Sequence, residues 1–368
     1  MDIFFVAFLV YIFMREALSA SQENGGALLT LAYAAYAFLL YYGMAVVGQG
    51  KNALRVIITL LIYLVIVISA YALLEFFLNN DFLFGDLVQE KIPDPGRGYF
   101  RAGSSLGHPV VMGLFLVQAM PFLLYKYALV RPGGKKYMWV GIIVMAFLAL
   151  EMSMTKGAWI SGGILGVIAI VWLWRKKSAR KPMIVVLVAI SLALTVFTFC
   201  YRDMLEAGVT SETRSKESVA PRLYIWKRVP AGIAENPVFG AGMWQGVSQL
   251  YALQPVDPGI TKPPNAIDNQ YMTLIVEQGV TGLLLAMAVF FTIGGQAWKL
   301  MRARSSHATW AALIAASLCA VLINAMTTNS LMTWPNMVVF WLLAGALRAL
   351  TELSHKGKAG YVPPLSGT

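Results

Sequence analysis

Two arginines are the residues of this sequence best suited to binding an anion. Arg101 lies in the segment GYFRAGSSLGHP, with Arg97 four residues upstream, and Arg222 begins the segment RLYIWKR. A guanidinium presents a planar fork of donors that matches phosphate oxygens, and the unpaired N–H groups of a helix start favour an anion. Together, Arg101 and Arg222 would therefore suit a diphosphate. The alternatives are a membrane-interface arginine for Arg101 and a solvated helix face for Arg222.

Asp268 is the acidic residue that we single out. It ends a long polar segment just before an apolar run and is followed by Asn269 and Tyr271. A carboxylate in that place could act as a general base that takes a proton from a hydroxyl. The alternative is a helix N-cap, a position that Asp268 and Asn269 would both suit. Glu277 lies on roughly the opposite face of the same expected helix, so we expect it to brace helix packing rather than share the pocket of Asp268.

A short helix is predicted to carry further candidates beside Arg222. Trp226 lies one turn after Arg222, and Lys227 and Arg228 follow it directly. These basic residues could extend an anion-binding group. The alternative is again a solvated helix face, which charge runs usually are.

Histidine and cysteine exclude several kinds of site. On the topology given below, His108 is the one external histidine, so neither Ser-His-Asp catalysis nor a His-rich zinc site can be assembled there. We expect His108 to have a structural or capping role. Cys200 and Cys319 fall inside apolar runs, which argues against a disulfide framework or a thiolate metal site. We therefore expect no metal and no cofactor.

Apolar runs are the elements that must position these residues. Hydrophobic residues make up 58% of the 368-residue chain and charged residues 13%, and the mean hydropathy is +0.66. This composition predicts an all-α polytopic membrane protein, a single integral membrane domain over residues 1–368 with about ten transmembrane helices. The first run is interpreted as a span rather than a removed signal peptide. The expected spans lie near residues 3–14, 27–48, 54–78, 108–127, 138–155, 157–174, 183–201, 270–297, 308–326 and 333–350.

The basic residues predict the orientation of these spans. Most of them fall in one set of loops, and the positive-inside rule places both termini in the cytoplasm. Residues 79–107 and a large loop over residues 202–268, with short helices of its own, are then external. Residues 354–368 form a cytoplasmic tail. Because the charges lie in short loops between spans, the net charge of +11 does not indicate a nucleic-acid partner.

Four motifs resemble those of the O-antigen ligase and Wzy-type polymerase superfamily, which are bacterial polytopic membrane glycosyltransferases. DNQYMTLIVEQGVTGLL resembles the HN-x-x-L … E-x-G-x-x-G signature, and RLYIWK followed by NPVFGAGMW resembles the R-x-x-x-W … NP-x-x-G-x-G segment. GYFRAGSSLGHPVVMG resembles the first external motif, and SMTKGAW resembles the T-x-S-R-G-x-W motif. Asp268 stands where the ligases have His, and Lys156 stands where the motif has Arg. The DN form is more similar to capsule or exopolysaccharide polymerases.

The resemblance implies a glycosyltransferase that uses no metal and takes its glycan from a polyprenyl-diphosphate-linked donor. Arg101 and Arg222 would contact the donor diphosphate, and Asp268 would be the base for the acceptor hydroxyl. The residues expected to bind substrate around them are Arg97, Trp226, Lys227, Arg228, Asn269, Tyr271 and Lys156.

The function expected from this resemblance is polymerisation of the repeat units of an O-antigen, capsule or exopolysaccharide. The reaction would take place at the outer face of the bacterial inner membrane. The donor, a sugar acceptor, the lipid bilayer and a chain-length regulator protein are the expected partners. The alternative is a ligase that moves a finished glycan onto a lipid or protein. A transporter or flippase is less favoured, because its binding groups would lie near the bilayer midplane.

Overall fold

The computed structural model of this chain is helical, with no strand in the residues that it describes. These are residues 2–19, 24–50, 52–78, 102–131, 133–174, short pieces between 184 and 196, 220–256, 263–303 and 307–355. The predictions for Arg97 and Arg101, for residues 202–219 and for most of the tail lie outside the described residues. The expected all-α fold class is confirmed.

The long helices coincide with the predicted apolar runs, because a backbone in lipid must form its hydrogen bonds within its own segment. Most of the expected span over residues 183–201 lies outside the described part of the chain. The helices are α1 (Asp2–Ser19), α2 (Asn24–Val47), α3 (Ala53–Leu78), α4 (Pro109–Leu129), α5 (Gly134–Met152), α6 (Lys156–Trp174), α12 (Gln270–Arg302), α13 (Ala308–Asn324) and α14 (Asn336–His355). His108 caps α4 as expected, since its Nδ1 accepts a hydrogen bond from Val110 N at 3.2 Å.

Length and composition mark the chain as a multi-pass membrane protein. Among the described residues, five helices are long and apolar enough to cross a bilayer: α2 over Leu29–Val47, α3, α4, α12 and α14. The helix α13 is apolar but shorter. The prediction of about ten spans and the orientation of the termini remain predictions.

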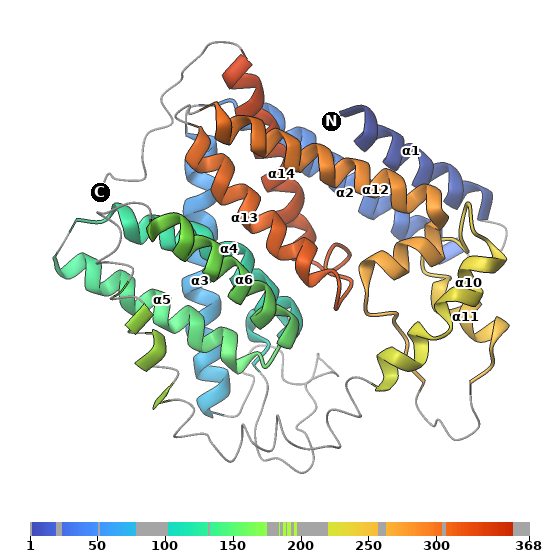
Figure 1. Ribbon diagram of the computed structural model, residues 1–368, viewed down its shortest axis with the longest axis horizontal. Coiled ribbons are helices and arrows are strands. Elements are labelled where there is room, and N and C mark those ends of the chain that lie inside the picture. Colours follow the sequence, from blue (N-terminus) through green and yellow to red (C-terminus); the bar gives the residue numbers. More distant parts are fainter. Residues whose placement is uncertain are drawn as a thin grey trace.

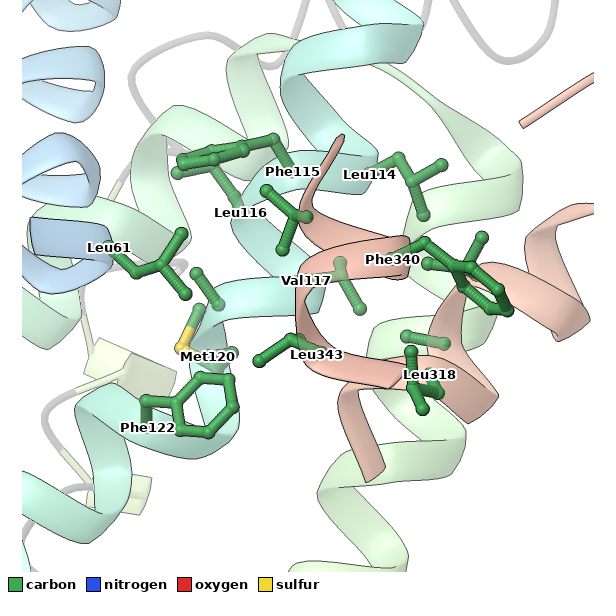
Figure 2. Packing of buried hydrophobic residues seen from close by; sticks show 14 of the residues in the cluster. Leu61, Leu114, Phe115, Leu116, Val117, Met120, Phe122, Leu318, Phe340 and Leu343 are labelled. Carbon is green, nitrogen blue, oxygen red and sulfur yellow. The ribbon is translucent and has the colours of Figure 1, made fainter. Parts of the chain in front are cut away.

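The helices pack through close contact rather than through hydrophobic exclusion, since lipid tails are as apolar as the side chains. In Figure 1, α14 lies against α2, α13 against α4, α3 against α5, and α1 along α12. At the α2–α14 interface, a Cβ on Gly345 would overlap the backbone carbonyl of Tyr41, so this glycine allows the two helices to approach. Figure 2 shows part of the main apolar core, where Met120 and Val117 of α4 lie between Leu61 of α3 and Phe340 of α14.

Two short helices occupy one end of the molecule, at the right in Figure 1. They are α10 (Val229–Glu235) and α11 (Gly246–Leu253), and a further helix over residues 220–226 precedes them. Both α10 and α11 pack on α12. Short helices thus lie within residues 220–253, ahead of α12, while the large external loop over residues 202–268 stays a prediction.

The helix α12 is broken at Gly279, whose backbone has φ 66° and ψ −173°. This conformation is open to glycine and strongly disfavoured for other residues. A break leaves backbone groups unpaired on both of its sides. The loop over residues 236–245, between α10 and α11, supplies their partners. The backbone hydrogen bonds are Ala241 N to Val276 O (2.9 Å), Gly242 N to Glu277 O (2.8 Å), Val280 N to Pro237 O (2.9 Å) and Thr281 N to Val238 O (3.3 Å).

Candidate active site

Asp268 and Arg222 meet at the start of α12. The Nε of Arg222 lies 3.2 Å from Oδ2 of Asp268. The two side chains are 35% and 39% exposed, so the pair is open to solvent and to a ligand. The structure therefore brings the predicted base together with one of the two predicted phosphate-binding arginines, although 46 residues separate them in the sequence.

Asn269, and not Asp268, is the N-cap of α12. The Oδ1 of Asn269 accepts hydrogen bonds from the backbone N–H groups of Tyr271 and Met272, each at 3.1 Å. Its Nδ2 donates to the carbonyl of Met326 at 3.0 Å. Asp268 has a φ of 51°, a left-handed conformation that Asp and Asn tolerate better than most residues. Capping therefore does not account for Asp268, and its carboxylate points toward Arg222 instead.

The helix that carries Arg222 is anchored directly to the residue before Asp268. Nε1 of Trp226 donates to the carbonyl of Ile267 at 2.6 Å. A small apolar cluster lies beneath this contact, and it includes Ile225, Leu250 and Ile267, each almost fully buried. Trp226 was predicted to bind substrate. Its observed contact fixes the spacing between the Arg222 helix and the start of α12.

Tyr251 of α11 holds the segment that leads into Asp268. Its hydroxyl donates to the carbonyl of Pro264 at 2.7 Å. Burial raises the pKa of Tyr251, and the nearby Tyr224 adds to the effect while Arg228 opposes it. The hydroxyl therefore keeps its proton at ordinary pH and remains a donor.

Arg228 and Lys227 are placed very differently, although they are neighbours in the predicted anion-binding group. Lys227 is exposed. Arg228 is only 8% exposed, and its guanidinium lies 3.7 Å from the centre of the Tyr224 ring. It donates to the carbonyls of Tyr224, Gln254 and Pro255 at 3.0 to 3.3 Å. Its contacts are thus internal, joining the Arg222 helix to the end of α11.

The side chain of Tyr271 contacts α13 rather than Asp268 or Arg222. Its hydroxyl donates to the carbonyl of Leu322 in α13 at 2.8 Å. Two residues later, Thr273 bonds to Asn329 at 3.0 Å. These contacts fix the first turns of α12 on α13 and the residues that follow it.

Lys156 lies at the same end of the molecule as Asn269. It begins α6 and is exposed. The next residue, Gly157, packs so closely on Thr327 that a Cβ would overlap the threonine hydroxyl. Met326, the neighbour of Thr327, accepts the hydrogen bond from Asn269. The first turns of α6 and α12 are therefore joined through one short segment.

The chain next to Arg101 also reaches this end. Arg97 and Arg101 lie outside the described residues, but Ala102 N donates to the carbonyl of Met152 at 3.2 Å. Met152 ends α5, just before the turn that leads to Lys156. The backbone after Arg101 is therefore fixed at the α5–α6 turn.

Glu277 braces packing, as expected from its position in α12. It is 6% exposed and accepts hydrogen bonds from the backbone of Trp244 and Gly246. A Cβ on Gly246 would approach the Glu277 side chain within 2.9 Å, so the glycine allows this contact. Glu277 thus holds the end of the 236–245 loop and does not face Asp268.

An apolar cavity of about 90 Å³ lies between α1, α2, α12 and α14. Its lining includes Ile12 and Ala34, together with Gln270 and Gln278 of α12. The Oε1 atoms of both glutamines are buried without a hydrogen-bond partner in the described part of the chain. Gln270 is two residues from Asp268, so the cavity begins close to the candidate site.

A comparison with known families bears on the segment that carries these residues. The O-antigen ligase family matches this chain over residues 141–287. That segment includes Lys156, Arg222, Asp268 and the break in α12, so the resemblance to the superfamily is confirmed there. Arg101 lies outside the matched segment. The comparison with curated proteins finds no match.

The O-antigen ligase match concerns enzymes of the glycosyltransferase type. Among the described residues, no group of three or more His, Cys, Asp and Glu side chains is placed to hold a metal ion. Sequence reasoning missed the contacts of Arg15 and of the buried Glu16 with the 236–245 loop. Two charges at the end of an apolar run were their only signal.

Proposed function

We propose that the protein polymerises polyprenyl-diphosphate-linked repeat units of a bacterial surface polysaccharide at the outer face of the inner membrane. The observation that carries the proposal is the pairing of Arg222 with a non-capping Asp268. Two residues after Asp268, Gln270 lines an apolar cavity. The acid can accept a proton and the arginine can bind phosphate. The cavity suits the chain of a lipid-linked substrate.

The proposed reaction is one displacement. The acceptor hydroxyl oxygen bonds to the anomeric carbon of the donor sugar, and the bond from that carbon to the diphosphate oxygen breaks. Asp268 takes the hydroxyl proton, and polyprenyl diphosphate leaves with the bonding electron pair. Arg222 and Arg101 stabilise the negative charge that grows on this leaving group.

The contact between Arg222 and Asp268 fits a site that changes partners when substrate binds. An ion pair that is more than a third exposed is worth about 0–1 kcal/mol, so a diphosphate can draw the guanidinium away at little cost. Both side chains would then be available, the arginine to phosphate and the carboxylate to the incoming hydroxyl. Lys227 is exposed directly after the helix that carries Arg222, and Lys156 is exposed at the start of α6; both are proposed to add positive charge to the substrate site.

The cavity beside Gln270 is proposed to hold the first isoprenoid units of the donor. Its walls come from the apolar faces of α1, α2, α12 and α14. Burying isoprenoid surface there would hold the diphosphate beside Arg222. Gln270 and Gln278 would accept hydrogen bonds from water at the polar end of the chain, because an unpaired buried oxygen costs about 1–3 kcal/mol.

The alternative proposal is a ligase that transfers a finished glycan to a separate lipid or protein. The family match is common to both proposals, and the Asp-Asn motif at Asp268 favours the polymerase. Both use the same donor and the same leaving group, so the identity of the acceptor separates them.

Purified protein in lipid vesicles, supplied with a lipid-linked repeat unit, tests these readings. Longer glycan on the same lipid supports the polymerase. Glycan on an added acceptor, with release of the diphosphate lipid and no elongation, supports the ligase. Movement of the donor across the bilayer without bond formation would refute both transferase proposals. The Asp268→Asn variant is the matched negative control.

A further inference from the structure

The outer end of α1 contacts the loop that fills the break in α12. Arg15 donates from Nε to the carbonyl of Phe239 at 2.9 Å and from an Nη group to the carbonyl of Gly240 at 2.7 Å. Glu16 is 4% exposed, and its carboxylate accepts the backbone N–H of Met243 at 2.7 Å. One helix therefore binds both carbonyl and N–H groups of the 236–245 loop.

A third residue of α1 reaches α12 itself. The hydroxyl of Tyr11 donates to the carbonyl of Gln278 at 2.6 Å. Gln278 directly precedes Gly279, where the helix is broken. Its carbonyl therefore lies at a helix end, where carbonyls lose their partners within the helix. Tyr11 and Arg15 lie on one face of α1, because positions four residues apart share a face of a helix, and Glu16 follows Arg15 directly.

The loop alone does not hold all of these groups in place. Its backbone pairs with α12 through Pro237, Val238, Ala241 and Gly242. The carbonyls of Phe239 and Gly240 and the N–H of Met243 point toward α1 instead, and they are the groups that Arg15 and Glu16 bind. The N–H of Met243 is buried at its contact with Glu16, and a buried backbone group without a partner is costly, so we expect α1 to stabilise this shape of the loop.

The same loop connects the two halves of the candidate active site. The Arg222 helix and α10 precede it, and the part of α12 that starts beside Asp268 leads into the break that it fills. A shift of the loop would therefore move Arg222 relative to Asp268, whose contact spans only 3.2 Å. Figure 1 shows α1 running along α12 toward α10 and α11, which is the path that this coupling needs.

We propose that Tyr11, Arg15 and Glu16 are positioning residues for glycosyl transfer, acting through the 236–245 loop to keep Arg222 and Asp268 in register. This inference rests on the proposed function. Neither the motifs nor the family match includes these residues, since the match begins at residue 141. In this view, α1 is part of the catalytic framework and not only a membrane anchor.

Kinetics of donor consumption by the full-length protein in lipid vesicles test the proposal. Arg15→Ala should lower kcat at least tenfold while the KM for the donor changes less than threefold, because the donor-binding groups remain present. Glu16→Ala should act in the same direction. Glu16→Gln should restore most of the activity, since a carboxamide oxygen can still accept the N–H of Met243. Met14→Ala, at an exposed position of the same helix, is the control and should behave as wild type.

Thermal unfolding measured on the same samples separates positioning from simple stability. If Arg15→Ala and Glu16→Ala lower the Tm while kcat per folded molecule stays at the wild-type value, the proposal is wrong. Tyr11→Phe removes one hydroxyl and keeps the ring, so it serves if the other variants do not fold; an unchanged kcat there would also overturn the proposal. Failure of the wild type and of Met14→Ala to form any glycosidic bond would instead contradict the proposed function.

Discussion

Replacement of Asp268 by Asn gives the sharpest test of the candidate site. The substitution keeps the shape of the side chain and removes its charge and its capacity to take a proton. Asn tolerates the left-handed φ of 51° at this position, so we expect the backbone conformation to stay the same. Asn269 still caps α12, since its hydrogen bonds to Tyr271 and Met272 do not involve Asp268.

The structure sets different magnitudes for the two possible roles of Asp268. Its contact with Arg222 is a single 3.2 Å ion pair between side chains that are 35% and 39% exposed. Such a pair is worth about 0–1 kcal/mol, which corresponds to at most about a fivefold change in rate. A general base contributes about 10²–10⁴-fold. The two roles therefore differ by more than an order of magnitude in rate.

The assay is the initial rate of glycan transfer from a lipid-linked donor, measured beside thermal unfolding of the same sample. We expect Asp268→Asn to lower kcat by at least about 100-fold and the free energy of unfolding by no more than about 1 kcal/mol. Glu235→Gln removes an exposed carboxylate of α10 and is the matched control, which should keep wild-type activity. A rate for Asp268→Asn within about fivefold of wild type would show that the carboxylate only holds Arg222.

Three further changes probe the break in α12, the cavity and the internal arginine. Gly279→Ala should destabilise the fold by at least about 2 kcal/mol and abolish transfer, because a Cβ would overlap Val238 and the backbone conformation suits glycine. The control is Gly163→Ala within α6, where an added Cβ meets open space. This variant should leave the Tm unchanged or raise it. Ala34→Phe should raise the KM for a long-chain donor and leave the KM for a short-chain analogue unchanged. Ala35 is an exposed neighbour that does not line the cavity, so Ala35→Phe should change neither KM. An equal rise in both KM values for Ala34→Phe would exclude a chain-binding cavity. Arg228→Lys should lower the free energy of unfolding by about 2 kcal/mol with little change in the KM for the donor. The reason is that Lys cannot contact the three carbonyls and the Tyr224 ring at once. A changed KM with unchanged stability would indicate that Arg228 binds substrate.

The sequence alone determined the helical segments and the order of the motifs. Apolar runs near the length of a bilayer predict helices without reference to the rest of the chain, because lipid offers the backbone no other partner. The same local reasoning placed His108 at a helix cap and Glu277 in helix packing, and both predictions are confirmed. It also singled out Arg222 and Asp268 as candidates, although it could not show that they meet.

The different roles of adjacent residues of similar type follow from tertiary contacts alone. Asp268 and Asn269 suit an N-cap equally well by residue type, and the choice falls to Asn269 because its amide also reaches Met326, which is far away in the sequence. Lys227 and Arg228 look alike as a basic pair, yet the fold turns Arg228 inward onto carbonyls more than 25 residues away. The docking of Arg15 on the 236–245 loop joins groups 224 residues apart. Contacts of this kind depend on where packed helices bring distant backbone groups together, and no local periodicity records them.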